Sequence, residues 1–277
     1  VIEFQDMIFG KQSRSIEDIE DFALRRSDGS PTYHLASCVD DVELEISHVI
    51  RGQDHLTNTF KHILLFEALD FRLPTFGHLP LLLGPDGSKL SKRKHGSIVS
   101  LTTYRDRGFL GRGLVNYLSL LGWSSKDGRE IFTPEELLGA FSVSGIQRSN
   151  AVVKFDGSND ENWADPKALW VNSQHLRTVD VEDLVHYVEK QFLADDLWSS
   201  DFVGEEHDRL IKMVDMLRAR YVTLRDFVEK GAAYFSDEFK IEPRARKNLD
   251  KEGARELLHE LAERLKSYEE DVFNEDN

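Results

Sequence analysis

Apolar and polar positions in the first part of the chain follow the pattern of short strands. Residues 1–14 read as a strand and a turn, and residues 76–83 form another apolar run that reads as a strand. Residues 31–51 alternate strand-like runs with an acidic turn at residues 40–43. Short apolar runs bounded by turn residues are typical of sheet strands. We therefore expect a β-sheet in this part of the chain.

A helical period interrupts this pattern at residues 54–69. The apolar positions recur there at the spacing of one helical face: Leu56, Phe60, Ile63 and Leu64. Asp54 is expected at the N-cap of this helix or in its first turn. Strand, helix, strand is typical of a parallel sheet with crossover helices, so the fold class expected for this part is α/β.

Beyond residue 97 the pattern becomes helical. Residues 102–107 and 113–121 are short helical candidates that glycines interrupt. The sequence Thr133-Pro134-Glu135-Glu136 predicts a helix start, with threonine at the N-cap, proline at the first position and glutamate at the third. Residues 156–165 are polar and rich in turn formers, and we expect them to form a surface insertion.

From residue 180 onward the whole chain reads as helix. Two apolar stripes recur at helical spacing and are expected in the core of an α-helical bundle: Leu210, Val214, Leu217 and Tyr221 in one, and Leu257, Leu258, Leu261, Leu265 and Tyr268 in the other. The acidic residues 269–277 are expected to be frayed.

Composition is that of an intracellular globular protein. The 277 residues suggest two or three domains. No apolar run approaches the ~20 residues of a membrane span. Residues 1–6 also lack the basic and apolar stretches of a signal peptide, so we expect a cytoplasmic protein without a membrane partner. The single cysteine, Cys38, excludes an intramolecular disulfide and a multi-cysteine zinc site, and its apolar neighbours predict a buried thiol.

Charge is unevenly distributed along the chain. The net charge of −15 argues at first against a nucleic-acid partner, but the charge at a contact surface matters more than the sum. Four cations gather in the loop from Gly84 to Gly96: Lys89, Lys92, Arg93 and Lys94. This loop lacks the spacing of a Walker P-loop and of a Rossmann glycine turn. Three roles remain open for it: binding a nucleotide triphosphate, binding an RNA backbone, or lying solvated without a ligand.

The order Lys89-Leu90-Ser91-Lys92-Arg93 resembles the Lys-Met-Ser-Lys-Ser loop of class I aminoacyl-tRNA synthetases. Further motifs look like those of the glutamyl-tRNA synthetases of bacteria and organelles, in the same order: Ser27-Asp28-Gly29-Ser30-Pro31-Thr32-Tyr33, Val39-Asp40-Asp41, Ile46-Ser47-His48-Val49-Ile50-Arg51-Gly52, Asn116-Tyr117-Leu118, Leu120-Leu121-Gly122-Trp123 and Leu169-Trp170-Val171-Asn172. Several motifs in register are more specific than any one of them. The resemblance runs from about residue 3 to about residue 240.

The resemblance implies ATP-dependent ligation of glutamate to tRNA(Glu) through a glutamyl-adenylate. The implied ligands are glutamate, ATP, tRNA(Glu) and Mg²⁺ carried by the ATP, without zinc, in a monomer. The implied fold is the second half of a Rossmann-type catalytic domain followed by α-helical regions. Its expected divisions are the end of an acceptor-binding insertion at 1–30, the half Rossmann domain at 31–96, a stem-contact region at 97–170 and a truncated anticodon-binding domain at 171–277.

The resemblance also assigns residues to the first reaction step. Catalysis is assigned to Lys89, Ser91 and Lys92, because positioned cations and a hydroxyl stabilise the charge that develops at the α-phosphate. ATP binding is assigned to a set that overlaps with these residues: Asp54, His55, Lys89, Leu90, Lys92 and Arg93. The alternative for His55 is a structural role, in which the side chain caps the following helix or packs against it.

Glutamate binding is assigned to Tyr33, Ser37 and Arg51. Arg51 follows a predicted strand, and α/β sheets bind ligands at their strand ends. A guanidinium can pair with a carboxylate through two hydrogen bonds. The alternatives are a surface ion pair for Arg51 and a half-buried packing role for Tyr33.

Contacts with tRNA are expected from basic residues on the later helices: Arg209, Lys212, Arg218 and Arg220, with Arg225 nearby. Arginine binds phosphates and stacks on or hydrogen-bonds to bases. Solvated helix faces with partners one turn away are the alternative for each residue.

The chain departs from the family pattern at several positions. Gln53 stands where an acidic residue is common, Phe60 where proline is common, and Arg148-Ser149 where Lys-Ser is usual. The larger departure is that no tetrapeptide like His-Ile-Gly-His, which belongs to the ATP site, occurs in the sequence. We therefore expect a fragment that lacks the N-terminal half of the catalytic domain and that does not form adenylate alone.

Three other readings stay open at this point. The chain could be a stand-alone tRNA-binding remnant, one half of a split synthetase, or a queuosine-modifying glutamyl transferase paralogue. The helical region beyond Asn172 argues against the paralogue, which lacks an anticodon domain. It also argues against a glutaminyl enzyme, whose anticodon region is β-rich.

Overall fold

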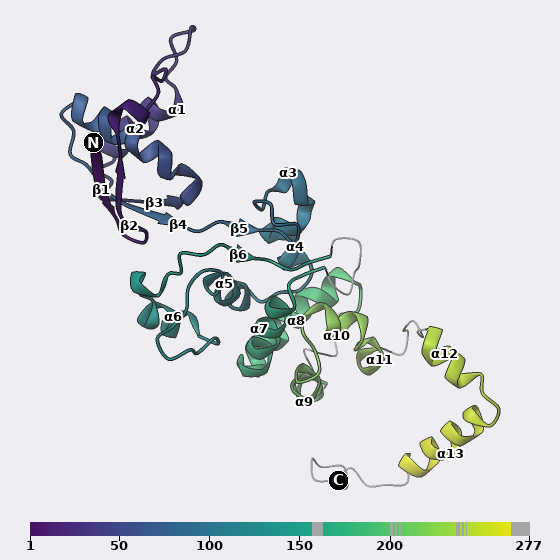
Figure 1. Ribbon diagram of the computed structural model, residues 1–277. Coiled ribbons are helices and arrows are strands. Elements are labelled where there is room, and N and C mark those ends of the chain that lie inside the picture. Colours follow the sequence, from purple (N-terminus) through teal and green to yellow (C-terminus); the bar gives the residue numbers. More distant parts are fainter. Residues whose placement is uncertain are drawn as a thin grey trace. The chain divides into compact units, whose positions relative to one another are not determined.

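The computed structural model describes residues 1–156, 163–199, 202, 204, 206–236, 239, 241 and 243–266. The chain divides into two compact units, Val1–Val228 and Glu229–Asn277. Figure 1 labels the helices and strands along the chain.

The first unit begins with a four-stranded sheet in the order β2-β1-β4-β3 (Figure 1). Its strands are β1 (Ile2–Asp6), β2 (Gly10–Arg14), β3 (His48–Gly52) and β4 (Thr75–Leu79). The first two strands form an antiparallel hairpin, and β3 and β4 are parallel. A parallel pairing of Asp6 with Phe76 joins the hairpin to β4. The predicted strand and turn at residues 1–14 and the parallel crossover are confirmed.

Two helices pack beside this sheet: α1 (Tyr33–Glu43) and α2 (Leu56–Ala68). Phe60 and Ile63 of α2 lie in one apolar cluster with Ile2 and Phe76 of the sheet. The predicted apolar face of this helix is therefore confirmed. A second cluster joins α1 to α2 through Cys38, which is fully buried, as expected for its thiol.

The prediction for residues 31–51 was wrong in its first half. Residues 33–43 form α1, and the expected acidic turn at residues 40–43 is the last turn of that helix. Cys38 and Val42, four residues apart, both face the cluster against α2, which is a helical spacing. A run of five small and apolar residues is too short to distinguish a strand from a buried helix segment.

Two further local expectations need correction. Asp54 does not cap α2, because His55 occupies the N-cap position without a side-chain cap bond. Asp54 lies instead in the first turn of a 3₁₀ segment, Gln53–His55, that leads directly into α2, so only the N-cap alternative was wrong. The apolar run at residues 76–83 is divided between β4 and a separate strand, β5 (Leu82–Leu83). Pro80, which lacks a backbone N–H, stands between them. Strand β5 pairs in parallel with β6 (Ala151–Val152) in a sheet of its own.

The basic loop leads from β5 into a short helix. Helix α3 (Lys92–His95) begins at Ser91, whose Oγ accepts a hydrogen bond from the backbone N–H of Lys94. A short 3₁₀ turn, Gly96–Val99, follows this helix. Further 3₁₀ turns lie at Ile16–Asp18, after β2, and at Val143–Gly145.

The middle of the first unit is helical, as predicted. Its helices are α4 (Leu101–Asp106), α5 (Gly111–Ser119) and α6 (Pro134–Ala140). Helix α6 begins with the predicted capping box: the Thr133 side chain accepts from the N–H of Glu136, and the Glu136 carboxylate accepts from the N–H of Thr133. The predicted helix start at Thr133 is confirmed.

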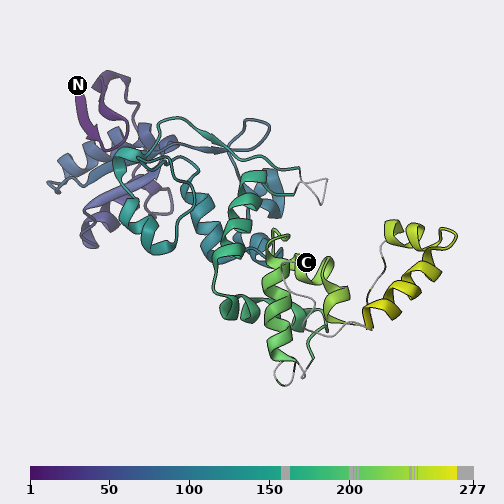
Figure 2. The same cartoon turned by 90° about the horizontal axis from the view of Figure 1, so that it is seen from below.

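Four more helices complete the first unit: α7 (Pro166–Thr178), α8 (Val181–Ala194), α9 (His207–Arg218) and α10 (Arg225–Glu229) (Figures 1 and 2). The predicted stripe of Leu210, Val214, Leu217 and Tyr221 is buried, so its core role is confirmed. Fully buried Asn172 accepts from the N–H of Leu110 and donates to the carbonyl of Val222, which links α5, α7 and the segment after α9.

The expected surface insertion at residues 156–165 is only partly within the described residues, since 157–162 lie outside them. Trp163 is buried in the cluster around α5 and α7. Asp165 is buried too and caps α7 by accepting from the N–H of Lys167. The expectation was therefore wrong for residues 163–165, because aromatic packing and a helix cap hold them inside.

The second unit contains α11 (Ala232–Phe235), α12 (Pro243–Leu249) and α13 (Ala254–Lys266). The apolar stripe of α13 was expected in a core, but its described members are exposed: Leu257, Leu258, Leu261 and Leu265. Helical spacing predicts a shared face and does not say what covers it. Tyr268 and residues 269–277 lie outside the described residues.

Candidate active site

Arg51 stands at the carboxyl end of β3, one residue before the strand ends. Its guanidinium makes four contacts: Nε donates to His78 Nε2 at 3.3 Å, Nη2 donates to Thr59 Oγ1 at 2.8 Å, and Nη1 lies 3.3 Å from Tyr33 Oη and 3.5 Å from His62 Nδ1. None of these partners is a carboxylate. The positive charge of Arg51 is therefore held by neutral groups and remains available for an anion.

Behind Arg51 lies a buried carboxylate and imidazole pair. His78 Nδ1 is 2.6 Å from Asp6 Oδ2, and both side chains are fully buried. Asp6 also accepts hydrogen bonds from the backbone N–H groups of Ile8 and Phe9. These bonds and His78 lower the pKa of Asp6 although burial opposes the shift. Burial lowers the pKa of His78, with Asp6 acting in the opposite direction.

Two more histidines extend this polar cluster towards α1. His62 Nε2 lies 3.1 Å from His34 Nδ1. Burial, together with the nearby Arg51 guanidinium, lowers the pKa of His62 to about 3. Burial also lowers the pKa of His34. Both imidazoles are therefore neutral near pH 7 and place no second positive charge beside Arg51.

The three residues predicted to bind glutamate lie on β3 and on the start of α1. Tyr33 is the first residue of α1, and its side chain is exposed beside Arg51. Ser37 lies four residues later on the same helix and is half-buried. Residues four apart share a helix face, so Ser37 stands one turn behind Tyr33.

Asp54 and His55 form the next part of this corner, where β3 leads into α2. Asp54 Oδ2 lies 2.5 Å from Lys89 Nζ, so the basic loop is tied to the strand end. The hydrogen bond from Lys89 lowers the pKa of Asp54. The His55 ring lies 5.8 Å from the ring of Tyr33. Tyr33, Arg51, Asp54, His55 and Lys89 are thus brought together.

The remaining loop residues stand on or next to α3. Leu90 donates its backbone N–H to the carbonyl of Leu82, which closes the turn. Lys94 pairs with Asp86 at 2.5 Å. Lys92 and Arg93 are exposed, and neither has a carboxylate partner among the residues that the structure describes. These two cations are therefore the ones free to meet an anion.

The residues predicted to bind tRNA differ in their surroundings. Arg218 donates to the carbonyl of Val179 and pairs with Asp215, so it has a structural role. Arg209 pairs with Glu206. Lys212 and Arg220 are exposed, and no carboxylate contacts them within the described part of the chain. Arg225 pairs with Asp195. In the described residues none of these side chains contacts the Arg51 corner.

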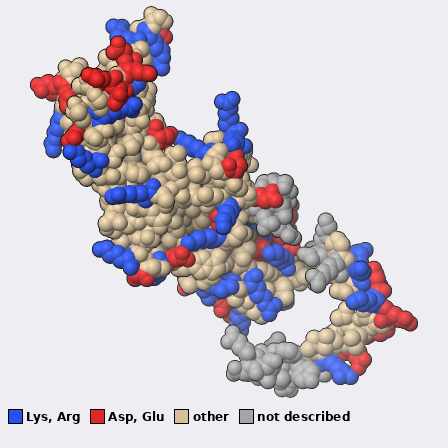
Figure 3. All heavy atoms as spheres, in the orientation of Figure 1, with Lys and Arg blue, Asp and Glu red and all other residues tan. Residues whose placement is uncertain are grey.

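Charges of both signs are interspersed over the face in Figure 3, with broad areas of other residues between them. Within the described part, no three His, Cys, Asp or Glu side chains gather as a metal site would require. None of the described helices combines the length and the hydrophobicity needed to cross a membrane.

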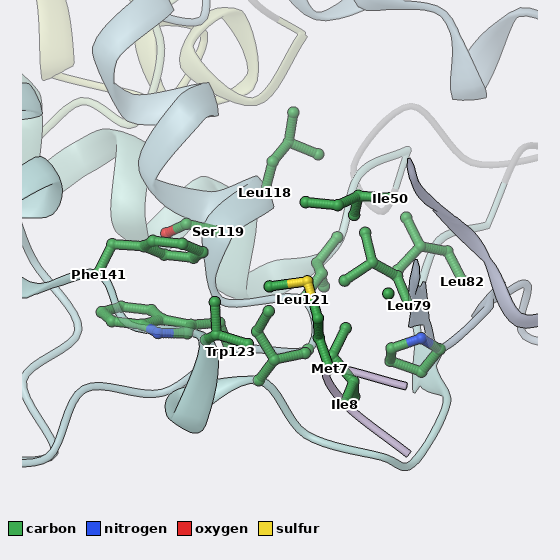
Figure 4. A pocket seen from close by; sticks show the side chains of 15 residues that line it. Met7, Ile8, Ile50, Leu79, Leu82, Leu118, Ser119, Leu121, Trp123 and Phe141 are labelled. Atoms are coloured by element: carbon green, nitrogen blue, oxygen red, sulfur yellow. The ribbon is translucent and has the colours of Figure 1, made fainter. Parts of the chain in front are cut away.

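An apolar pocket of about 370 Å³ opens on the other face of the sheet. Successive strand residues point to opposite faces, so Ile50 lines this pocket while Arg51 faces α2. Figure 4 shows Ile50, Leu79 and Leu82 on one side of the pocket, and Ser119, Trp123 and Phe141 on the other. This pocket does not take part in the Arg51 site.

Several members of the Arg51 cluster were missed at the level of sequence: Asp6, His34, Thr59, His62 and His78. One signal was available for Asp6. Ile2, Phe4 and Asp6 share the inward phase of an alternating strand, so a carboxylate occupies an apolar position. The partner of Asp6 lies 72 positions away, and no local pattern shows that pairing.

Comparison with known proteins identifies the family. Residues 1–157 match "tRNA synthetases class I (E and Q), catalytic domain", and residues 182–277 match "Anticodon binding domain". The first match covers more than half of the chain, so the chain belongs to the class I tRNA synthetases of the glutamate (E) and glutamine (Q) group. The expected fold class is confirmed.

Curated relatives of the chain point to glutamate within this group. The chain is 43% identical over 271 residues to a glutamate–tRNA ligase of Desulfotalea psychrophila, covering 97% of this chain and 55% of that protein. It is 48% identical over 234 residues to that of Solibacter usitatus, covering 84% of this chain and 46% of that protein. The resemblance to glutamyl-tRNA synthetases is thereby confirmed.

A solved structure also matches. The crystal structure of a glutamate tRNA ligase from Elizabethkingia meningosepticum in complex with its amino acid aligns with a TM-score of 0.76 at 28% identity, covering 97% of this chain and 53% of that chain. The chain therefore spans about half the length of the relatives that it matches.

Proposed function

We propose that the protein containing this chain ligates glutamate to tRNA(Glu) in two steps, through a glutamyl-adenylate formed from ATP. The observation that carries this proposal is the guanidinium of Arg51, held at a strand end by neutral partners. A site for an anionic amino acid needs such a charge. The family membership and the glutamate–tRNA ligases among the relatives support it.

In this proposal Arg51 binds the side-chain carboxylate of glutamate, and Tyr33 and Ser37 complete the amino-acid pocket. Tyr33 is accessible and its hydroxyl already lies against Nη1 of Arg51. Pairing between guanidinium and carboxylate is charge-assisted, so an uncharged glutamine side chain would bind less well. The site thus distinguishes the two amino acids of the family by charge.

The basic loop is proposed to bind and activate ATP. Lys89 and Lys92 would stabilise the charge that develops as the glutamate carboxylate attacks the α-phosphate and pyrophosphate leaves. Ser91 and Arg93 would hold the phosphates, with Leu90 supplying backbone groups. Asp54 and His55 would form the edge of this site. Mg²⁺ would arrive on the ATP phosphates, which supply most of its oxygen ligands.

The tRNA is proposed to contact the helical regions, and the match of residues 182–277 to an anticodon-binding domain supports this. The same match favours a ligase over the queuosine-modifying paralogue. Lys212 and Arg220 are the best candidates for phosphate contacts, with Arg209 and Arg218 beside them on α9. The four expected divisions of the chain, the monomer and the cytoplasmic location stay predictions.

The test is charging of tRNA(Glu) by the full-length protein, with glutamate or glutamine supplied at matched concentration. Glutamate is expected to be transferred with the higher kcat/KM. The Arg51→Gln variant should reduce this preference, because it replaces the cation by a neutral amide. Retained tRNA binding without any charging would instead support the remnant reading and refute the ligase proposal.

A further inference from the structure

We propose that Asp6 and His78 are positioning residues that fix the orientation of Arg51 through a relay of hydrogen bonds, with Thr59 as the third support. The inference rests on the proposed function only in naming glutamate as the ligand of Arg51. Asp6, His78 and Thr59 lie behind the guanidinium and are fully buried, so they act on the substrate through Arg51.

The register of two parallel strands creates this relay. Arg51 of β3 is the register partner of His78 of β4, and side chains at paired positions point to the same face. His78 Nε2 therefore lies 3.3 Å from Arg51 Nε. Thr59 Oγ1 lies 3.0 Å from the same His78 nitrogen and 2.8 Å from Arg51 Nη2. Two sides of the guanidinium are thereby fixed.

The relay requires one tautomer of His78. Ionised Asp6 accepts a hydrogen bond at 2.6 Å from Nδ1, so the proton of the neutral ring is on Nδ1. The lone pair on Nε2 then faces the Arg51 Nε–H. With the proton on Nε2 instead, that N–H could donate to Thr59 Oγ1, but the Arg51 Nε–H would lose its acceptor and the guanidinium its support on that side.

Asp6 is itself held so firmly that it cannot rotate to adapt. Oδ1 accepts from the N–H groups of Ile8 at 2.9 Å and Phe9 at 2.8 Å, and from that of His78 at 3.3 Å. In an Asp6→Asn variant the amide oxygen has to stay on these three donors. The NH₂ group then faces His78 Nδ1, which must become an acceptor, and the ring takes the opposite tautomer.

The decisive experiment is Asp6→Asn in the full-length protein, assayed by charging of tRNA(Glu). The KM for glutamate is expected to rise about tenfold, whereas the KM for ATP changes less than about twofold, because only the amino-acid cation loses its position. Thr59→Val, which removes the acceptor for Nη2, is expected to act in the same direction. If the Asp6→Asn variant does not fold, the KM for glutamate of the Thr59→Val variant tests the relay instead.

A matched control is Asp165→Asn. Asp165 is also a buried carboxylate of the first unit that accepts two backbone N–H bonds, from Lys154 and Lys167. This control is expected to lose stability while the KM for glutamate stays at the parental value. An equal rise in KM for both variants would mean that general loss of structure is responsible, and it would overturn the inference.

The Arg51→Lys background gives a second test, because lysine has no Nε–H for the relay to hold. There the Asp6→Asn change should have no further effect on the KM for glutamate, whereas a purely structural role would add its full effect. Additive effects would contradict the relay.

A spectroscopic readout separates this inference from the proposed function. In ¹⁵N-histidine-labelled full-length protein, His78 is expected to carry its proton on Nδ1, and on Nε2 after Asp6→Asn. If the His78 tautomer switches in Asp6→Asn but the parent does not charge tRNA(Glu), the proposed ligase function is refuted and the hydrogen-bond relay is supported. Two outcomes would overturn the relay. One is a His78 tautomer that stays the same in Asp6→Asn, and the other is an unchanged KM for glutamate in Asp6→Asn when the parent does charge tRNA(Glu).

Discussion

Lys89 and Asp54 are thirty-five positions apart in the chain, yet Lys89 Nζ lies 2.5 Å from Asp54 Oδ2. This pair attaches the basic loop to the corner between β3 and α2. The hydrogen bond from Lys89 lowers the pKa of Asp54. In a Lys89→Met variant the pKa of Asp54 is expected to rise towards the usual value of about 3.9.

A ¹³C NMR titration of the aspartate carboxyls measures this change. Asp28, whose pKa is lowered by hydrogen bonds from Ser30, is an internal control and should titrate as in the parent. A pKa of Asp54 that does not move on loss of the ammonium would show that the pair does not form in solution.

Lys92 is exposed at the start of α3 and has no carboxylate partner among the described residues. In the full-length protein, Lys92→Ala is expected to lower kcat for adenylate formation by about 10²–10³-fold, as for other preorganised electrostatic groups. The KM for glutamate should change far less. Pyrophosphate exchange measures both parameters, with Lys126→Ala, an exposed lysine outside the loop, as control. A near-normal exchange rate would remove the loop from the mechanism.

His62 makes stability depend on pH. Its pKa is lowered to about 3 by burial and by Arg51, whereas an unfolded histidine titrates near 6.5. The unfolded state therefore binds the proton first as pH falls. The contribution of His62 is complete above about pH 6.5 and is lost as pH falls towards 3.

Replacing His62 by glutamine should flatten this dependence by up to about 1.4 kcal/mol per pH unit between pH 6 and 4. Urea unfolding at several pH values measures the slope. Gln174→Ala on α7 removes no titratable group, so this variant should keep the parental slope. A parental slope in the His62 variant would mean that this imidazole does not titrate as described.

Asn172 holds three segments of the first unit together. Asn172→Ala leaves the N–H of Leu110 and the carbonyl of Val222 without their partners. Because these groups are desolvated, the free energy of unfolding is expected to fall by about 2–4 kcal/mol. Gln174→Ala on the same helix should change it by less than about 0.5 kcal/mol. Urea titration monitored by circular dichroism distinguishes the two; equal effects would contradict the role of Asn172.

Lys212 and Arg220 are the exposed, unpaired cations of the predicted tRNA set within the described residues. If each contacts a phosphate, Lys212→Ala or Arg220→Ala should reduce the slope of log K against log salt for tRNA(Glu) by about one. Filter binding of the full-length protein at several salt concentrations gives the slope. Lys190→Ala, whose parent side chain lies over the Tyr187 ring, is the charge-matched control. If the slope of log K against log salt does not change in these variants, Lys212 and Arg220 do not contact phosphates of the tRNA.

Sequence patterns predicted elements whose signal is local. The capping box at Thr133 and the apolar face of α2 need only a few neighbouring residues, and both were found. Residues 33–43 were misassigned because their short apolar run suits a strand as well as a helix. The stripe of α13 shows that periodicity predicts a face but not its burial.

The family motifs name several residues that the structure places together, and their roles in binding stay predictions. Arg51, Tyr33, Asp54 and Lys89 do meet at one corner. The support behind Arg51 was not predictable, because Asp6 and His78 are joined only by the pairing of β1 with β4. Buried histidines without a local motif look the same in a sequence whether they pack or position a neighbour.

Because β1 joins β4 through the pairing of Asp6 with Phe76, the geometry around Arg51 depends on the correct register of these two strands. A slip of β1 by one residue would turn Asp6 to the opposite face of the sheet. His78 would then be buried without its carboxylate, and Arg51 would lose its orientation. Molecules with misaligned strands would therefore be less stable, and their Arg51 would not be oriented for the proposed ligand. The stability of the sheet and the geometry of the proposed site thus depend on the same carboxylate.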